Sequence, residues 1–548
     1  MTGNSAFGTP HSPFDCIFIG GGHNGLTAAA YLARAGRKVL VLERRDVVGG
    51  AAITGELAPG LRISTASYLM SLLLPEVERD LELARHGYKV LPRSPSSFTP
   101  CEDGRYLLMG ADADLNRREI GKFSARDAEA YPRYEALLTR IAEILEPTMM
   151  ETPADLLPLP ASFRRRGVFD WLRQLGRGHK LYRALQKLGD DLPAAIEILG
   201  GAARPILERW FESEPLRGTL ATDAIIGAFA PPSAPGSAYV LLHHVMGQAG
   251  GARGVWGYVQ GGMGALTQAL AASAREAGAE IRTGAEVAQI EVSGGRACGV
   301  RLKSGEVLAA WAVASSADAH VTFEKLTAPQ HLPAAFRDAV ARIDYSSASL
   351  KINLAVKELP DFTCCPGRDA PGPQHRGTIH INSSLEDIER AYDDAKYGRP
   401  SLKPVIDMTI PSTLDSTLAP PGIHMVGMFV QYAPYKLAAG NWDSVKDGFA
   451  DRCIREVSRL APNFAASVLH REVISPLDLE RTFGLTGGNI FQGSMALHQL
   501  FSLRPVPGWS DYRTPLPGLY LCGAAAHPGG GVMGAAGRNA AREILRDL

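Results

Sequence analysis

Residues 15–43 read DCIFIGGGHNGLTAAAYLARAGRKVLVLE, and this stretch decides the fold. The short apolar run at 16–19 is typical of a parallel strand that is buried on both faces. A glycine-rich turn follows, and the apolar spacing after it predicts a helix over 24–35 that ends at Gly36. A second strand is predicted over 39–42. This order of strand, glycine turn, helix and strand predicts a Rossmann-like unit.

The glycine turn matches the dinucleotide-binding pattern G-x-G-x-x-G at Gly20, Gly22 and Gly25. These glycines permit a tight turn, close approach of the backbone to a pyrophosphate, and close packing of the helix on the strand. Glu43 follows the second strand about twenty residues later, where a carboxylate can accept hydrogen bonds from ribose hydroxyls. The pattern therefore predicts a dinucleotide site, with an empty glycine-rich turn as the alternative.

The glycine spacing alone is weak evidence, because it occurs a second time in the chain. The strand, helix and acidic residue around the first match are what support a dinucleotide site. Gly529, Gly531 and Gly534 match the same pattern, yet only residues 535–548 follow them, too few for a helix, a second strand and an acidic residue. The C-terminal glycines therefore need another explanation.

Small residues follow the first unit. Arg44 comes directly after Glu43, and Gly50 and Ala51 lie a few residues further on. Small side chains allow the backbone to approach an extended ligand closely, so this stretch is predicted to lie along the rest of a bound dinucleotide. The alternative is a simple loop.

Composition excludes several classes of protein. The chain has 548 residues, more than one compact core needs. Lys plus Arg and Asp plus Glu are equal at 57 each, so no global charge attracts nucleic acid. The seven cysteines are sparse and form no C-x-x-C, which indicates free thiols and no redox dithiol. Metal-ligand spacings are absent.

No targeting or membrane-spanning signal stands out. Residues 1–12 lack the basic and apolar regions of a signal peptide, and we expect a disordered tail there. An uncharged apolar run of about eighteen residues, as a spanning helix needs, is also missing. We expect a soluble, cytoplasmic protein.

A locally basic stretch lies at 163–188 within a longer helical region. Arginines and lysines alternate there with aromatic and leucine residues, so the stretch could lie on an anionic membrane surface. The alternative is a helix that buries its apolar face and solvates its charges. Nucleic-acid binding is not expected, because the rest of the chain contributes no basic face.

The order of the predicted elements indicates an interleaved domain organisation. Strands are expected at 349–356 and 423–431, and a helix at 442–460. A three-stranded meander after 279, followed by a separate buried strand at 311–315, is expected to return the chain to the first domain. The predicted segments are a tail (1–12), the first domain (13–67, 261–317 and 482–548), and a second domain (68–260 and 318–481).

The C-terminus reads as a strand over 519–522, a glycine-rich loop, and a last helix from about Gly534. The N-terminus of a helix offers free amides and a partial positive charge. Such a site would stabilise the negative charge that a reduced flavin carries on its ring.

Two stretches carry a resemblance to a known family. IGGGHNGLTAAAYLARAGRKVLVLERRDVVGGAA at 19–52 and TGGNIFQGSMALHQLFSLRPVPGWSDYRTPLPGLYLCGAAAHPGGGVMGAAGRNAA at 486–541 resemble the phytoene dehydrogenase-related flavoproteins. The resemblance implies an α/β fold, α+β overall: a Rossmann-like FAD-binding domain assembled from separated segments, with an interleaved substrate domain of mixed sheet and helices.

The resemblance also implies roles for individual residues. His527 matches a position near the flavin, where it could shuttle a proton or hydrogen-bond within the loop. Gln492 stands where a histidine is expected among relatives. The implied FAD-binding residues are Gly20, Gly22 and Gly25 at the pyrophosphate, Glu43 at the ribose, Arg44, Gly50 and Ala51 alongside, Val287 at the adenine, and Gly523, Val532 and Met533 at the flavin.

The expected function is transfer of hydride equivalents between FAD and a carbon centre of a hydrophobic small molecule. Desaturation, saturation and double-bond isomerisation all fit, because the cofactor carries the difficult step. One alternative is a flavin amine oxidase, which an aromatic pair facing the flavin would favour. Another is a catalytically silent scaffold that binds FAD or a lipid. The sequence leaves the oligomeric state open.

Overall fold

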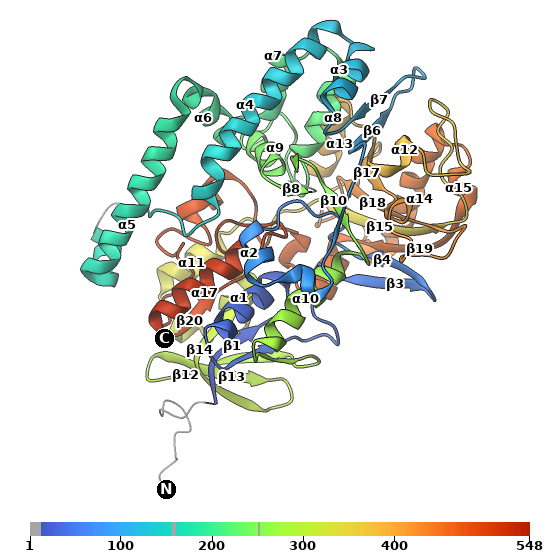
Figure 1. Ribbon diagram of the computed structural model, residues 1–548. Helices are drawn as coiled ribbons and strands as arrows, with labels where there is room; N and C mark the ends of the chain where they lie inside the picture. The colour runs from blue at the N-terminus through green and yellow to red at the C-terminus, as the bar shows by residue number, and fades with distance from the viewer. Residues whose placement is uncertain (1–12, 156–159, 250–251) are drawn as a thin grey trace.

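Two sheets of seven strands each organise the chain, and helices cover both of them (Figure 1). The computed structural model describes residues 13–155, 160–249 and 252–548, with the backbone alone over 160–169. The tail predicted at 1–12 lies outside the described residues.

The first sheet contains the Rossmann-like unit. Five of its strands run parallel, and two more extend it as an antiparallel hairpin. The parallel strands β1 and β2 are apolar and buried almost throughout, as strands covered on both faces must be. The strands are β11 (Glu280–Arg282), β2 (Val39–Leu42), β1 (Phe14–Ile19), β14 (Val307–Ser315), β13 (Arg296–Leu302) and β12 (Val287–Ser293) in spatial order, with β20 (Leu519–Leu521) also paired to β14.

Strand β14 differs from its prediction. A meander strand and a separate buried strand at 311–315 were expected, but one continuous strand spans both, so that prediction is wrong. Its first part pairs with β13 and its last part pairs with β1 and β20. Trp311 explains the error: the residue is 48% exposed and stacks under the guanidinium of Arg296, so an aromatic residue that suggested a buried strand lies on the open face.

The first and last helices of the chain are neighbours. Helix α1 (His23–Arg34) packs against α17 (Ala535–Asp547) on one side and α10 (Met263–Glu276) on the other (Figure 1). A Cβ at Gly537 would clash with the carbonyl oxygen of Asn24, so the two helices touch backbone to backbone. This contact joins the N-terminal turn to the C-terminal loop.

The second sheet is mostly antiparallel and carries different residues on its two faces. Leu350, Ile352 and Leu354 of its strand β15 pack into the core beneath helix α14 (Trp442–Leu460). The alternate residues point away from that core. The strands are β19 (Val468–Ile474), β15 (Ser349–Val356), β18 (His424–Gln431), β17 (Val405–Thr409), β16 (Thr378–Ile381), β6 (Ser97–Pro100) and β7 (Tyr106–Met109).

Helices dominate residues 68–260, as predicted, although this stretch also gives β6 and β7 to the second sheet. The helices of this part are α2 (Pro75–Asp80), α3 (Ala113–Gly121), α4 (Ala125–Met149), α5 (Pro160–Leu188), α6 (Leu192–Gly200), α7 (Ala203–Trp210), α8 (Glu214–Asp223) and α9 (Ser237–Val245). Further elements are β3 (Thr54–Ala58), β4 (Leu61–Ser64), β5 (Val90–Pro92), β8 (Gln248–Ala249), β9 (Ala252–Arg253), β10 (Gly257–Val259), α11 (Ala334–Ala341), α12 (Pro373–Arg376), α13 (Leu385–Lys396), α15 (Phe464–Ser467) and α16 (Pro476–Phe483).

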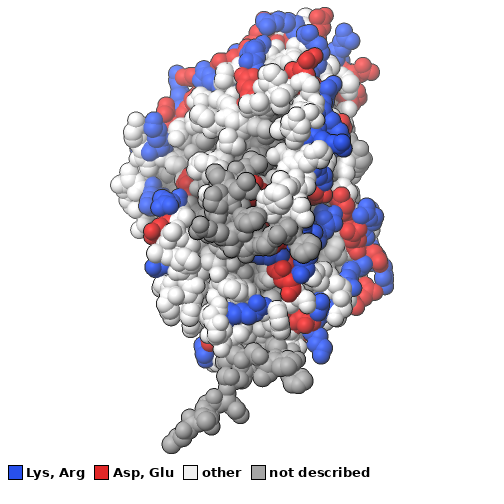
Figure 2. Space-filling model, turned by 90° about the vertical axis from the view of Figure 1, so that its left-hand side faces the viewer, with Lys and Arg blue, Asp and Glu red and all other residues white. Residues whose placement is uncertain are grey.

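Helix α5 contains the basic stretch, and it stands at one side of the molecule (Figure 1). Among its described side chains Leu172, Leu175 and Tyr182 are each at least half exposed. On the face that carries α5, blue and red side chains of the described residues are interspersed (Figure 2). No helix in the described ranges is long and apolar enough to cross a membrane. Peripheral membrane contact through 163–188 stays a prediction, and 163–169 lie outside the described side chains.

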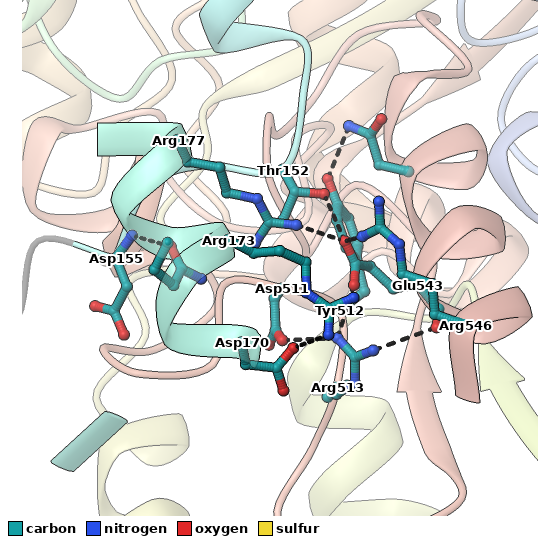
Figure 3. Close-up of polar contacts among 12 residues, drawn as sticks. Thr152, Asp155, Asp170, Arg173, Arg177, Asp511, Tyr512, Arg513, Glu543 and Arg546 are labelled. Carbon is teal, nitrogen blue, oxygen red and sulfur yellow. Dashed lines mark hydrogen bonds and ion pairs between the residues drawn. The ribbon is translucent and has the colours of Figure 1, made fainter. Parts of the chain in front are cut away.

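A buried carboxylate ties α5 to the C-terminal helix. Glu543 of α17 is 3% exposed and accepts hydrogen bonds from three arginines (Figure 3). The distances are 2.7 Å from Arg177 of α5, 2.9 Å from Arg513 and 2.6 Å from Arg546. Although burial opposes its ionisation, Arg177 and Arg513 hold the pKa of Glu543 below the usual glutamate value. The ionised form of Glu543 therefore stabilises the fold.

Replacing Glu543 with Gln should lower the free energy of unfolding at pH 7 by about 2 kcal/mol or more, because three guanidinium groups lose their shared charge. A carboxylate whose pKa is lowered in the folded state stabilises above its unfolded pKa, about 4.3, and this stabilisation is lost as pH falls. Denaturant unfolding should therefore show that the difference in the free energy of unfolding between wild type and variant becomes smaller as the pH is lowered.

Glu386→Gln is the matched control. Its pair with Arg390 is exposed at 56% and 75%, so this change should cost less than about 1 kcal/mol. Equal stability of the Glu543 and Glu386 variants would contradict the role of Glu543.

Candidate functional site

One cavity of about 860 Å³ is lined by both ends of the chain and by the second sheet. Gly20 and Gly22 of the N-terminal turn contribute to its wall, and so do Gly523 and Val532 of the C-terminal loop. The contact between α1 and α17 brings these distant segments together. The turn and the loop therefore face one common space.

The predicted glycine turn has the geometry that its sequence requires. Gly20 has a φ of +92°, which favours glycine, and a Cβ at Gly25 would clash with the carbonyl oxygen of Gly20. Gly22 is different, because the nearest atom to a Cβ there would be the Cα of Gly50 at 3.9 Å. Gly20 and Gly25 are thus required by the fold, whereas Gly22 leaves a space between itself and Gly50.

Glu43 lies where the second strand ends and lines the same cavity. Its carboxylate accepts hydrogen bonds from the amide of Gly21 at 2.8 Å and from the amide of Arg45 at 3.0 Å. Arg44 also lines the cavity, and its guanidinium donates to the carbonyl oxygen of Thr482 at 2.8 Å. Arg44 therefore joins the glycine unit to the end of α16.

Most of the other predicted cofactor residues also line this cavity. They are Gly50, Ala51 and Val287. Val287 is the first residue of β12, at the end of the cavity near Glu43. Met533 is absent from the wall: its side chain is 2% exposed, and its carbonyl oxygen accepts a hydrogen bond from the amide of Leu74 at 3.0 Å.

His527 is buried behind the C-terminal loop and does not line the cavity. Its ring lies 6.1 Å from the ring of Phe501, and its carbonyl oxygen accepts a hydrogen bond from Tyr512 at 2.8 Å. Burial lowers the pKa of the imidazole to about 3, so the ring is neutral. Neither ring nitrogen forms a hydrogen bond with a described residue. The proton shuttle and the hydrogen bond within the loop therefore both stay predictions.

Gln492 does line the cavity, at the position where a histidine was expected. Its side chain donates to the carbonyl oxygen of Ser316 at 3.3 Å and accepts from the amide of Ala525 at 3.0 Å. The amide group thus connects the end of β14 to the C-terminal loop.

Four histidines in the cavity wall were not predicted from the sequence: His23, His243, His244 and His380. Burial lowers the pKa of His23 to about 4 and that of His243 to about 3, so both rings are neutral at pH 7. His243 lies next to the C-terminal loop, with its Nε2 atom 3.4 Å from the position that a Cβ at Gly531 would take. His23 stands inside the glycine motif and could have been noticed, whereas nothing local marks His243.

A row of side chains crosses the second sheet on its cavity side. Lys351 is opposite Phe429, Phe429 is opposite Asp407, and Asp407 is opposite His380, on the adjacent strands β15, β18, β17 and β16. All of these residues line the cavity. Polar residues at alternate positions of a strand with an otherwise apolar sequence were the available signal for this row.

The polar members of this row are held by specific contacts. His380 Nδ1 lies 2.7 Å from a carboxylate oxygen of Asp407. Lys351 donates to the side-chain oxygen of Asn353 at 2.6 Å and lies 5.2 Å from the centre of the Tyr68 ring. Burial lowers the pKa of Lys351 to about 7. The charge of this lysine therefore changes near neutral pH.

Comparison with known proteins identifies the family. A family model described as flavin containing amine oxidoreductase matches residues 25–545. The chain belongs to this family. This flavin-containing oxidoreductase is 49% identical over 550 residues to pyridine nucleotide-disulfide oxidoreductase domain-containing protein 2 of Rattus norvegicus, covering 98% of this chain and 94% of the relative.

More distant relatives agree with the flavin-containing oxidoreductase family. Phytoene desaturase (lycopene-forming) of Pseudescherichia vulneris is 25% identical, with 97% of this chain and 99% of the relative covered. The solved structure of wild-type putrescine oxidase bound to putrescine shares the fold at a TM-score of 0.57 and 15% identity, covering 97% and 98% of the two chains. The resemblance to phytoene dehydrogenase-related flavoproteins is confirmed, and the chain is an FAD-dependent oxidoreductase.

The residues of the cavity fit FAD. The first hydrogen bond inside α1 runs from the Leu26 amide to the Gly22 carbonyl oxygen, so the amides of residues 23–25 in its first turn are available to a pyrophosphate. The space between Gly22 and Gly50 would be filled by a Cβ, which explains why both positions are glycine. The carboxylate of Glu43 lies beyond them, where it can accept from a ribose.

Gly22→Val should abolish the yellow colour of the purified protein without destabilising its cofactor-free form. A Cβ at Gly22 would have no neighbour closer than 3.9 Å in the protein but would occupy the space where we expect the pyrophosphate. Flavin absorbance per chain and denaturant unfolding of the cofactor-free protein measure the two effects separately.

Gly25→Ala serves as the comparison, because its Cβ would clash with Gly20 and should destabilise the protein with or without FAD. A Gly22→Val protein that keeps its full flavin content would place the pyrophosphate elsewhere.

Proposed function

We propose that this oxidoreductase moves hydride equivalents between FAD and a carbon centre of a largely apolar substrate. Desaturation, saturation and double-bond isomerisation are the reactions that this includes. The supporting observation is that a single cavity joins the glycine turn and the C-terminal loop to a chamber with aromatic walls over the second sheet. A substrate in that chamber would lie next to the flavin end of the cofactor site.

Bound FAD supplies the acceptor or donor of the hydride, and the protein orients the substrate and excludes water. The aromatic and aliphatic side chains of the chamber offer an apolar substrate a surface with little competition from water. They are Tyr68, Tyr131, Tyr134, Leu138, Leu220, Ile226, Trp256 and Phe429. The neutral rings of His23 and His243 place no charge beside the C-terminal loop.

Amine oxidation is the second candidate. The rings of Tyr68 and Phe429 stack at 6.0 Å in the chamber, and an aromatic pair of this kind suits a reaction at a carbon–nitrogen bond. The two candidates differ in their products, since oxidation of a carbon–carbon bond gives an alkene and oxidation of an amine gives an imine that hydrolyses to a carbonyl compound and ammonia or a smaller amine.

Anaerobic titration of the purified yellow protein tests the proposal. A panel of polyenes, fatty acids and amines is added to the oxidised protein, and unsaturated compounds are added to the photoreduced protein. For desaturation or saturation we expect loss of the flavin absorption in the first arm or its return in the second, with a product that differs from the substrate by two hydrogen atoms. For isomerisation we expect an isomer of the substrate and no net change in the flavin absorption. An imine or carbonyl product would favour amine oxidation, and neither a flavin response nor a product with any compound would favour a silent scaffold.

A pair of isoleucine variants locates the substrate. Ile226→Glu places a charge in the wall of the chamber and should slow reduction by an apolar substrate at least tenfold while leaving flavin content unchanged. Ile196→Glu makes the same change at a side chain that is 60% exposed, and should have no effect. Equal rates of flavin reduction for both variants would contradict the placement of the substrate in the chamber.

A further inference from the structure

One carboxylate in the chamber has no partner within the described part of the protein. Asp223 is the last residue of α8 and lines the cavity, yet its side chain forms no hydrogen bond or ion pair with any described residue. Its side chain is only partly exposed, and it lines the cavity. A partly buried carboxylate without a partner in the protein loses hydration with no compensating contact, so its place in a binding chamber points to a ligand.

The neighbouring charged groups are already engaged. Asp407 accepts from His380 at 2.7 Å. Arg93 donates to the carbonyl oxygen of Trp256 at 2.7 Å and to the hydroxyl of Thr378 at 2.7 Å. Unlike Asp407 and Arg93, Asp223 therefore has no hydrogen-bond or ion-pair partner among the described residues.

The electrostatic surroundings also leave Asp223 in need of a positive charge. Burial raises the pKa of Asp223, and the nearby carboxylate of Asp407 raises it further, while His244, His380 and Arg93 act in the opposite direction without reversing the shift. A cation placed beside Asp223 would favour its ionised form.

Three tyrosine rings lie near this carboxylate. Tyr131 and Tyr134 lie close enough for the charge of Asp223 to raise the pKa of both phenols further, although burial is the main cause of their shifts. Tyr68 and Trp256 line the same chamber. Aromatic faces together with a carboxylate are the arrangement that recognises an ammonium group, because the rings attract the cation without hydrogen bonds.

We propose that Asp223 binds a cationic nitrogen group, a protonated or quaternary amine, carried on the apolar substrate of this enzyme. The inference rests on the proposed function for the apolar part of the substrate and adds a positively charged group to that substrate. A plain hydrocarbon would leave Asp223 without a counter-charge. An anionic substrate would have to approach the carboxylates of Asp223 and Asp407. Of the nearby cations, Arg93 is already hydrogen-bonded to Trp256 and Thr378, and burial lowers the pKa of Lys351.

Three probes of equal chain length test this recognition: n-octylammonium, n-octanol and n-octanoate. Isothermal titration into the FAD-loaded protein should show that octylammonium binds at least about tenfold more tightly than octanol, equivalent to about 1.4 kcal/mol. Octanoate should bind most weakly. Asp223→Asn should remove the preference for octylammonium while leaving the affinity for octanol within about twofold, because the two side chains have nearly the same shape.

Asp393→Asn, at an exposed aspartate of α13, is the matched control and should keep the preference. The proposal is overturned if octanoate binds more tightly than octylammonium, if the three probes bind alike, or if Asp223→Asn leaves the preference unchanged. The titration detects binding rather than turnover. If octylammonium binds preferentially but no compound of the panel reacts with the flavin, the proposed function is refuted while the role of Asp223 stands.

Discussion

Close contact between backbones at the junction of the two chain ends is the constraint on which the rest of the structure depends. Gly25 lies against Gly20, Gly537 lies against Asn24, and Gly523 lies against Ser316, and a Cβ at any of these glycines would clash with a carbonyl oxygen. Because no side chain separates them, α1, α17 and the end of β14 converge on one point. The cofactor cavity is the space that this convergence leaves at the carboxyl ends of the parallel strands, where ligands of open α/β sheets bind.

The second sheet contributes charged and aromatic side chains to the cavity. Its strands alternate between a face that packs under α14 and a face that lines the cavity, so a row running from Lys351 to His380 is presented to whatever binds there. Helices α4, α8 and α9 close the chamber from the other side with aromatic residues and Asp223. The part of the cavity at the glycine turn is thus formed mainly by backbone and small residues, whereas the part over the second sheet carries large and charged side chains. Such a division allows one fold to accommodate different substrates beside a common cofactor site.

The sequence predicted much of the cavity wall at the glycine turn and little of the wall over the second sheet. Glycines at fixed spacing and an acidic residue after a strand are local signals, so Gly20, Gly22 and Glu43 could be placed without a structure. The row across the second sheet depends on the register of strands that lie far apart in the chain, which no local pattern encodes. Lys351 and Phe429, for example, are paired although 78 residues separate them. His527 and Met533 belong to the right loop but point away from the cavity, because a glycine-rich loop does not reveal which of its side chains turn inward. The continuous strand β14 was missed because Trp311, a large aromatic residue, is exposed.

The central claim is that the two ends of the chain form the wall of a single FAD site. Electron density for the flavin in crystals of the purified yellow protein tests it most directly. We predict one extended FAD per chain, with its adenosine beside Glu43 and Val287, its pyrophosphate over Gly20 and Gly22, and its ring beside Gly523 and Val532. Flavin density that contacts residues from only one end of the chain, or that lies outside the cavity, would contradict this placement.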